Sequence, residues 1–181
     1  MSRAFYMVQM LERELGDRPI SGAEIGVFRG EHALLMLEHL NIKKLYLIDP
    51  YETDDPSFVG KMKVKGLIAG AYAIAEEALS DYSDKTVWML MPSDEAVKII
   101  FNDASLHFVY IDGNHNYEHT KCDIKNYLSL VRPGGFLGGH DYMMRSSPLI
   151  EVKRAVDEFI EATGYELNVS PGKFPEWWVQ V

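Results

Sequence analysis

The feature that most constrains this chain is a regular alternation of short apolar runs with longer stretches whose apolar residues recur at helical spacing. The runs expected to form strands are Gly22–Gly26, Lys44–Asp49, Thr86–Met91, His107–Asp112, Phe136–Gly139, Tyr165–Val169 and Trp177–Val181. The helical stripes predict helices at about residues 4–15, 31–40, 67–80, 94–101, 117–131 and 152–160. Such alternation predicts an α/β fold: a Rossmann-like, seven-stranded, mostly parallel sheet with helices on both faces.

The size and punctuation of the chain indicate one domain. It has 181 residues, of which 47% are apolar, enough for one sizeable core. Glycine and proline fall between the apolar segments, and neither an internal repeat nor a low-complexity tract is present. We therefore expect a single domain spanning residues 1–181.

Cysteine content and net charge indicate where the protein is located in the cell and which classes of partner it can bind. A lone cysteine, Cys122, cannot form an internal disulfide, and the first residues lack the apolar core of a signal peptide. We therefore expect a cytoplasmic protein, with no apolar stretch near the roughly 20 residues that cross a bilayer. The net charge of -9 disfavours nucleic acid and anionic membrane surfaces as partners. Small neutral or cationic ligands remain.

The first expected strand leads into the turn Glu24-Ile-Gly-Val-Phe-Arg-Gly30. Gly26 and Gly30 allow a tight turn close to a ligand, and the next helix begins with free N–H groups that suit a carboxylate or phosphate. A dinucleotide fingerprint would place glycine at positions 24, 26 and 29, but this chain has Glu24 and Arg29 there. The turn therefore disfavours a nicotinamide cofactor. The alternative is that the two glycines only form a tight turn.

Asp49 ends the second expected strand. An acidic side chain at this point of an α/β sheet can accept hydrogen bonds from the two hydroxyls of a ribose. An aspartate at a strand end also serves as a helix cap or turn residue. Taken together with the glycine turn, Asp49 favours a ligand that contains ribose.

The most specific segments are Ile111-Asp-Gly-Asn-His-Asn-Tyr117 and Gly138-Gly-His-Asp-Tyr142. With the glycine turn, they make residues 20–160 resemble the class I S-adenosylmethionine-dependent methyltransferases, especially the small-molecule branch that includes macrocin O-methyltransferase. The resemblance implies that the cofactor is S-adenosyl-L-methionine. It implies cofactor contacts from the glycine motif Glu24, Gly26 and Gly30, from Asp49 at the ribose, and from Ser93 in the adenine-side loop.

The same resemblance implies an acceptor side. Asp112, His140 and Asp141 occupy the positions where macrocin and catechol O-methyltransferases bind a divalent cation, Mg²⁺ or another. His140 stands where those enzymes have an acid, and imidazole is a less natural magnesium ligand. His115 matches the expected base for the acceptor hydroxyl. The alternatives are that His140 and Asp141 bind substrate or each other directly, and that His115 only caps its loop.

Two residues depart from the pattern of the resembled family. Many relatives have a serine or threonine after the second glycine, whereas Glu31 and His32 open the helix here. Because the methionine carboxylate is expected nearby, Glu31 should point away from it. Phe28 stands where many methyltransferases have glycine.

The resulting hypothesis is methyl transfer from S-adenosylmethionine to a small-molecule acceptor, at an oxygen of a sugar or phenol. Two alternatives are a Rossmann-type nicotinamide-dependent oxidoreductase and a non-catalytic module that binds the cofactor. The segments Asp54–Lys65 and Met143–Pro148 are expected to set acceptor specificity. Trp177 and Trp178 are expected to pack in the core and on an edge strand. The resembled enzymes are commonly dimeric, which implies a homodimer.

Overall fold

The computed structural model describes residues 5–52, 68, 70–100, 105–142 and 151–181. The two segments expected to set acceptor specificity, Asp54–Lys65 and Met143–Pro148, lie outside these ranges. All of the site residues discussed below lie within them. Seven strands form one sheet in the order β3-β2-β1-β4-β5-β7-β6. Their bounds are β1 Ile20–Ile25, β2 Ile42–Ile48, β3 Thr86–Met89, β4 Leu106–Ile111, β5 Val131–Gly139, β6 Asn168–Val169 and β7 Trp177–Gln180.

The pairing of these strands confirms the predicted sheet. Strand β1 pairs in parallel with β2 and β4, and the parallel arrangement extends outward to β3 and β5. The last two strands are antiparallel, β7 to β5 and β6 to β7. Parallel strands need crossover connections, and the intervening helices supply them.

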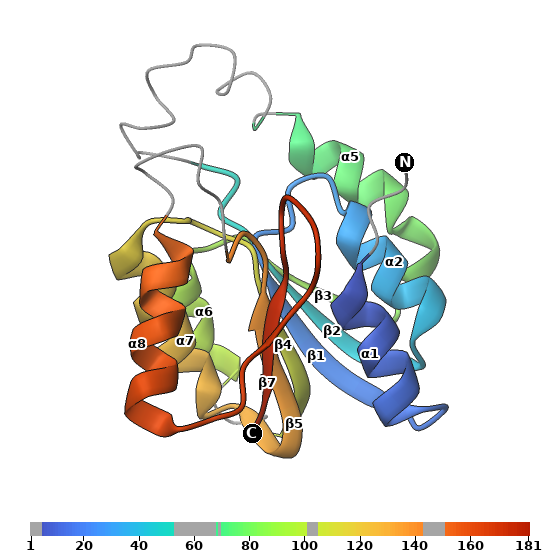
Figure 1. The fold of residues 1–181 in the computed structure, drawn as a ribbon. Helices are drawn as coiled ribbons and strands as arrows, with labels where there is room; N and C mark the ends of the chain where they lie inside the picture. The colour runs from blue at the N-terminus through green and yellow to red at the C-terminus, as the bar shows by residue number, and fades with distance from the viewer. Residues whose placement is uncertain (1–4, 53–67, 69, 101–104, 143–150) are drawn as a thin grey trace.

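The helices cover both faces of the sheet, as Figure 1 shows. On one side lie α1 (Tyr6–Leu15), α2 (Glu31–His39) and α5 (Ala71–Ala78), and on the other lie α6 (Ser93–Ile100), α7 (Tyr117–Leu128) and α8 (Val152–Thr163). A short 3₁₀ helix, Ser80–Tyr82, precedes β3. Within the described ranges, none of the helices combines the length and apolar character needed to cross a bilayer.

Several predicted boundaries differ from the structure. The strand expected at Tyr165–Val169 is limited to Asn168–Val169, and the strand expected to begin at Phe136 begins at Val131. The expected helix of residues 117–131 ends at Leu128, and Val131 instead begins β5, opposite Leu106 of β4. Leu128 and Val131 are three residues apart, so both suit a helical stripe, and Val131 is also buried as a strand residue. The backbone ladder with β4, which the sequence does not display, decides the assignment.

The sheet separates two apolar layers, which together form the core. One layer includes Val109, Leu137 and Trp177, and the other includes Leu11, Met36 and Phe108. Trp177 is fully buried, as predicted, and Trp178 packs at the margin of the second layer. The predicted edge-strand position is wrong, because β7 lies between β5 and β6.

Glu176 connects the end of the chain to its first helix. Its carboxylate accepts hydrogen bonds from the Met7 N–H, at 2.8 Å, and from the Tyr110 hydroxyl, at 3.0 Å. Helix α1 has no side-chain cap from its own N-cap residue, Phe5, so Glu176 accepts from one of the N–H groups left free at that helix end. Because Glu176 is only 2% exposed, both of its partners depend on it rather than on water.

Replacing Glu176 with alanine should therefore destabilise the protein strongly. The change leaves two buried donors without an acceptor, which corresponds to roughly 2 to 5 kcal/mol of unfolding free energy. Urea denaturation measures the loss. The matched control is Glu166→Ala on the exposed surface of the same C-terminal region, where we expect a change within about 0.5 kcal/mol. Equal effects of the two substitutions would contradict the capping role.

Candidate functional site

The candidate site lies where the parallel strands end. Strands β2, β1, β4 and β5 are neighbours, and the chain leaves all four at the same edge of the sheet. Backbone hydrogen bonds continue past the strand ends: Gly26 N–H donates to Ile48 O, Asp112 N–H to Ile25 O, and His140 N–H to Ile111 O. The residues that follow the strands are thereby held side by side. In open α/β sheets this edge, near the change of strand order, is where ligands bind.

Gly26 occupies a position that no other residue can fill. Its φ is +86°, and a Cβ built on it would lie 2.2 Å from the Asp112 carbonyl oxygen. Gly30 also has a positive φ, +77°, and forms the N-cap of α2. The first turn is therefore packed against the end of β4, and its glycines meet a steric requirement of the fold.

The Asp49 carboxylate joins the first two turns of the site. Its Oδ2 accepts hydrogen bonds from Val27 N–H at 3.0 Å and Phe28 N–H at 2.9 Å, and its Oδ1 accepts from Tyr51 N–H at 2.8 Å. Phe28 and Tyr51 both have a φ of +51°, a strained conformation for bulky residues. Asp49 thus stabilises two unusual backbone conformations. A carboxylate offers about four lone-pair sites, so roughly one remains for a ligand.

Glu24 and His32 form a buried pair beneath the glycine turn. Glu24 is 1% exposed, and its Oε1 lies 2.8 Å from His32 Nδ1. Burial raises the pKa of Glu24, against the lowering effect of His32. Glu24 Oε2 and His32 Nε2 are both buried and have no hydrogen-bond partner among the described residues. Glu31, the neighbouring acid, is exposed, consistent with the expectation that it points away.

Asp112, His115, His140 and Asp141 come together at the ends of β4 and β5. His115 Nε2 lies 3.1 Å from Asp112 Oδ1 and 3.3 Å from Asp141 Oδ2. His140 Nδ1 lies 3.1 Å from Asp141 Oδ1 and 3.8 Å from Asp112 Oδ1. We call these four residues the polar cluster. The structure brings together all of the predicted metal ligands and the predicted base.

The polar cluster favours a positive charge at its centre. Burial opposes the charged form of His115, but the hydrogen bond that its ring donates to Asp112 and the charges of both carboxylates outweigh this effect, so the pKa of His115 is raised. As an imidazolium, His115 has no free lone pair and cannot accept a proton. The base role predicted for His115 therefore requires that its proton first be lost.

The polar cluster also contains donor atoms that could bind a divalent cation, but the residues that offer them differ from the predicted ligands. Among the described residues, Asp112, His115 and Asp141 offer donor atoms that all lie within 4.8 Å of one another. His140, which the sequence analysis included as a ligand, is not in this set. Two carboxylate oxygens and an imidazole suit Mn²⁺, Fe²⁺ or Zn²⁺ better than Mg²⁺, which prefers oxygen ligands.

Ser93 has a partner that sequence reasoning missed. Its hydroxyl donates to Asp123 Oδ1 at 2.5 Å, and its carbonyl accepts from the Tyr127 hydroxyl at 2.8 Å. Asp123 is 4% exposed on α7, and burial raises its pKa to about 6 although the Ser93 hydrogen bond lowers it. The signal was an acid within the buried stripe of a helix, between Thr120 and Tyr127.

Phe174 is a second residue that the sequence did not identify. Its ring lies nearly parallel to the His140 imidazole, with the two ring centroids 6.5 Å apart. The side chain is 39% exposed. It provides an apolar wall beside the polar cluster.

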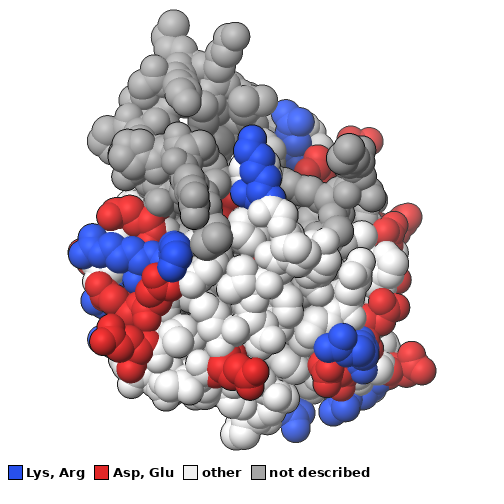
Figure 2. Space-filling model, viewed as in Figure 1, with Lys and Arg blue, Asp and Glu red and all other residues white. Residues whose placement is uncertain are grey.

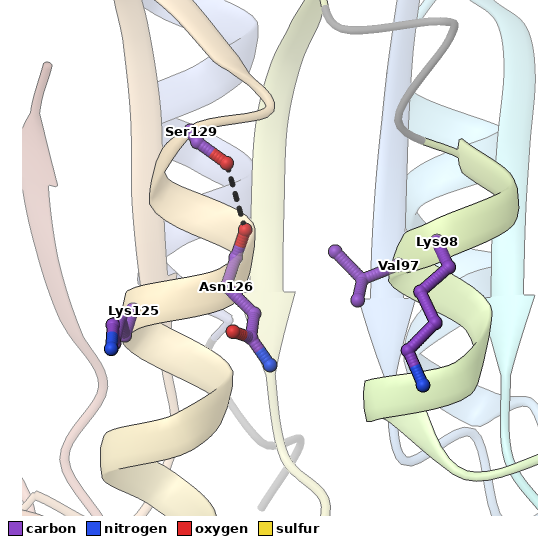
Figure 3. A pocket seen from close by; sticks show the side chains of 5 residues that line it. All are labelled: Val97, Lys98, Lys125, Asn126 and Ser129. Carbon is purple, nitrogen blue, oxygen red and sulfur yellow. Dashed lines mark hydrogen bonds between the residues drawn. The ribbon is translucent and has the colours of Figure 1, made fainter.

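A separate hollow of about 450 Å³ lies between α6 and α7. Figure 3 shows its lining residues, which are Val97 and Lys98 from α6, Lys125 and Asn126 from α7, and Ser129 just after α7. The lining residues of each helix belong to its later part, which lies toward the opposite edge of the sheet from the polar cluster. No buried polar side chain faces this hollow among the residues that line it, so it is not part of the candidate site.

Comparison with protein families identifies the family, and comparison with solved structures confirms the fold. Residues 23–142 match a family described as a methyltransferase domain. The chain is 26% identical to the uncharacterized protein R132 of Acanthamoeba polyphaga mimivirus, over 98% of this chain and 73% of that protein.

Solved structures show the same fold at low identity. An O-methyltransferase from Bacillus cereus in complex with SAH has a TM-score of 0.68 at 16% identity, covering 97% of this chain and 79% of that one. An rRNA methylase from Streptococcus thermophilus has a TM-score of 0.68 at 15% identity, covering 99% of this chain and 98% of that one. These likenesses confirm a Rossmann-like methyltransferase fold.

The buried Asp123 should make stability depend on pH. Because its pKa is raised from 3.8 to about 6, the folded state holds this proton more tightly than the unfolded state. The contribution of Asp123 to the free energy of unfolding is therefore present at low pH. It is lost as pH rises from about 4 to 7, by up to roughly 2 to 3 kcal/mol. Asp123→Asn does not titrate, so the variant should gain stability relative to wild type over that range.

Urea denaturation at about pH 4.5 and pH 7.5 measures this difference between the two proteins. Glu161→Gln, at an exposed position on α8, is the matched control and should keep a constant offset from wild type. A constant offset for Asp123→Asn as well would show that Asp123 is not held as a high-pKa acid.

Proposed function

The chain belongs to the family of methyltransferase domains, which its residues 23–142 match. We propose that it transfers the methyl group of S-adenosylmethionine to a small-molecule acceptor. The acceptor atom in this proposal is an oxygen, such as a sugar or phenolic hydroxyl. One observation carries the proposal within the structure: a glycine turn and an acidic strand end meet at the edge where β1 and β2 finish.

The residues beneath the turn fit the amino-acid end of that cofactor. Glu24 Oε2 and His32 Nε2 are buried polar atoms that lack partners in the described part of the chain, a costly arrangement unless a ligand completes it. An ammonium group would satisfy the Glu24 carboxylate. A carboxylate would be satisfied by a protonated His32, whose other nitrogen faces Glu24. The ribose would use the lone-pair site that remains on Asp49.

When bound, S-adenosylmethionine supplies an electrophilic methyl group on a sulfonium. The protein then has to align the acceptor with that methyl group and take up one proton. The polar cluster is suited to the proton, because His115 and the carboxylates of Asp112 and Asp141 lie within hydrogen-bonding or ion-pair distance of one another. Phe174 offers an apolar surface beside them for the body of the acceptor.

A divalent cation would be held by Asp112, His115 and Asp141. There it would lower the pKa of a coordinated acceptor hydroxyl. In this arrangement His115 would serve as a metal ligand, and the carboxylates of the cluster would compensate the positive charge of the cation. Without a cation, His115 in its neutral form is the group that takes the acceptor proton.

Charge supports a small-molecule acceptor over RNA, although one similar structure is an rRNA methylase. The chain has 18 basic against 27 acidic residues. On the face seen in Figure 2, the Lys and Arg side chains of the described residues are scattered among acidic ones and form no continuous basic surface. Binding to RNA depends strongly on such a surface. Binding of the same protein to a structured RNA would contradict this part of the proposal.

Replacing Asp49 tests the cofactor site. Asp49→Ala removes charge-assisted hydrogen bonds and should weaken the affinity for S-adenosylhomocysteine by roughly ten- to a hundred-and-fifty-fold in calorimetry. Asp49→Asn keeps one acceptor oxygen for the two turns and should give a smaller loss. Glu52→Ala removes the same charge from an exposed neighbouring position and should bind normally. Unchanged affinity in Asp49→Ala would overturn the ribose assignment.

The polar cluster makes a separate prediction about metal. Titration with Mn²⁺ should give saturable binding to wild type that Asp112→Asn and Asp141→Asn each weaken by at least about tenfold, because each loses a charged ligand. Asp94→Asn, at an exposed position on α6, should bind like wild type. In turnover assays, chelation should abolish methyl transfer and Mn²⁺ or Mg²⁺ should restore it.

A second outcome of the turnover assay would assign the chemistry differently. If chelation has no effect while His115→Ala lowers turnover by about a hundredfold or more, proton transfer runs on His115 without metal. Full activity after both treatments would exclude the cluster from the reaction.

A further inference from the structure

The hydrogen bond between Ser93 and Asp123 fixes the direction of a hydroxyl at the edge of the site. Ser93 Oγ donates to Asp123 Oδ1 at 2.5 Å, and the Tyr127 hydroxyl holds the Ser93 carbonyl from the same helix, α7. Asp123 is 4% exposed and Tyr127 is fully buried, so neither partner is free to turn toward solvent. The only proton of the Ser93 hydroxyl is therefore committed to Asp123. Toward any other group, Ser93 Oγ can act only as an acceptor.

The pair lies next to the turns that form the proposed cofactor site. Ser93 is the first residue of α6 and follows the end of β3, whose last residue, Met89, accepts a hydrogen bond from Asp49 N–H. Asp123 lies behind the turn after β4: a Cβ built on Gly113 would be 4.0 Å from Asp123 Oδ2. Ser93 is half-buried, whereas Asp123 is buried behind it.

We infer that Asp123 is a positioning residue that holds Ser93 Oγ as a hydrogen-bond acceptor, so that the site selects a purine with an exocyclic amine over one with a carbonyl at the same position. This inference rests on the proposed function, with the ribose at Asp49, and on the adenine-side position of Ser93 that the family resemblance implies. The amine of adenine is a donor and matches an acceptor oxygen. A 6-oxo purine presents an acceptor there, which would leave both oxygens facing each other without a proton.

Burial of the Asp123 carboxylate lowers the stability of the folded protein, which supports a functional reason for its presence. Burial raises its pKa to about 6, so the ionised form is disfavoured in the folded protein. Among the described residues, its one hydrogen bond is the one from Ser93. A buried carboxylate with a single hydroxyl partner is a poor stabilising device, whereas it is an effective way to orient that hydroxyl.

The test compares two ligands that differ only in the base: S-adenosylhomocysteine and S-inosylhomocysteine, its 6-oxo analogue. Calorimetry on wild type should show a preference for the adenine ligand of roughly ten- to a hundredfold. Asp123→Leu removes the acceptor and frees the Ser93 proton, so the preference should fall to within about threefold. Asp123→Asn keeps an oxygen that accepts the Ser93 proton and should retain the preference.

Ser93→Ala provides a second route to the same answer. It removes the oxygen that reads the base, so the preference should fall as in Asp123→Leu, with Asp123 unchanged. If Asp123→Leu does not fold, as judged by circular dichroism, the test compares Ser93→Ala, which should lose the preference for the adenine ligand, with Asp123→Asn, which should keep it. A preference that persists in folded Asp123→Leu or in Ser93→Ala overturns the inference. Failure of wild type to bind S-adenosylhomocysteine at all would instead overturn the proposed function, and the inference with it.

Discussion

The close packing of the first turn against the end of β4 is the constraint on which the site depends. At Gly26 the backbone lies so near the Asp112 carbonyl that even a methyl group would collide with it. This contact brings the glycine turn, the Asp49 carboxylate and the start of the polar cluster into one small region. The two parts of the proposed reaction, cofactor and acceptor, are adjacent because two strand ends touch there.

Within that region, electrostatics determine what each carboxylate can do. Asp49 is largely satisfied by backbone N–H groups, so it acts first as a structural link between turns. Asp112 and Asp141 instead share His115, whose raised pKa shows that the pair attracts a positive charge. An imidazolium and a divalent cation satisfy the same requirement. The polar cluster can therefore be occupied in two ways, which differ in whether His115 is a cation, a ligand or a base.

Two further acids, Glu24 and Asp123, are buried at a cost in stability. Each has a raised pKa because burial disfavours its charge, and each has one polar partner among the described side chains. Both lie directly behind residues that face the site. Their burial is understandable if they serve to orient or complete groups that bind a ligand, since neither forms the well-satisfied network that would stabilise a core.

The amino-acid sequence alone predicted how strands and helices alternate along the chain, and it predicted the ends of most strands to within one or two residues. Those properties depend on local periodicity and on glycine, both of which can be recognised without knowing what lies nearby. It also indicated Asp49, because ligands of open α/β sheets bind at the carboxyl ends of the strands. The four residues of the polar cluster were implied by the resemblance to small-molecule methyltransferases. The sequence could not determine the start of β5, the cap that Glu176 provides for α1, or the bond from Ser93 to Asp123. Each of these joins segments far apart in the chain, and such pairings are decided only when the sheet and its helices pack together.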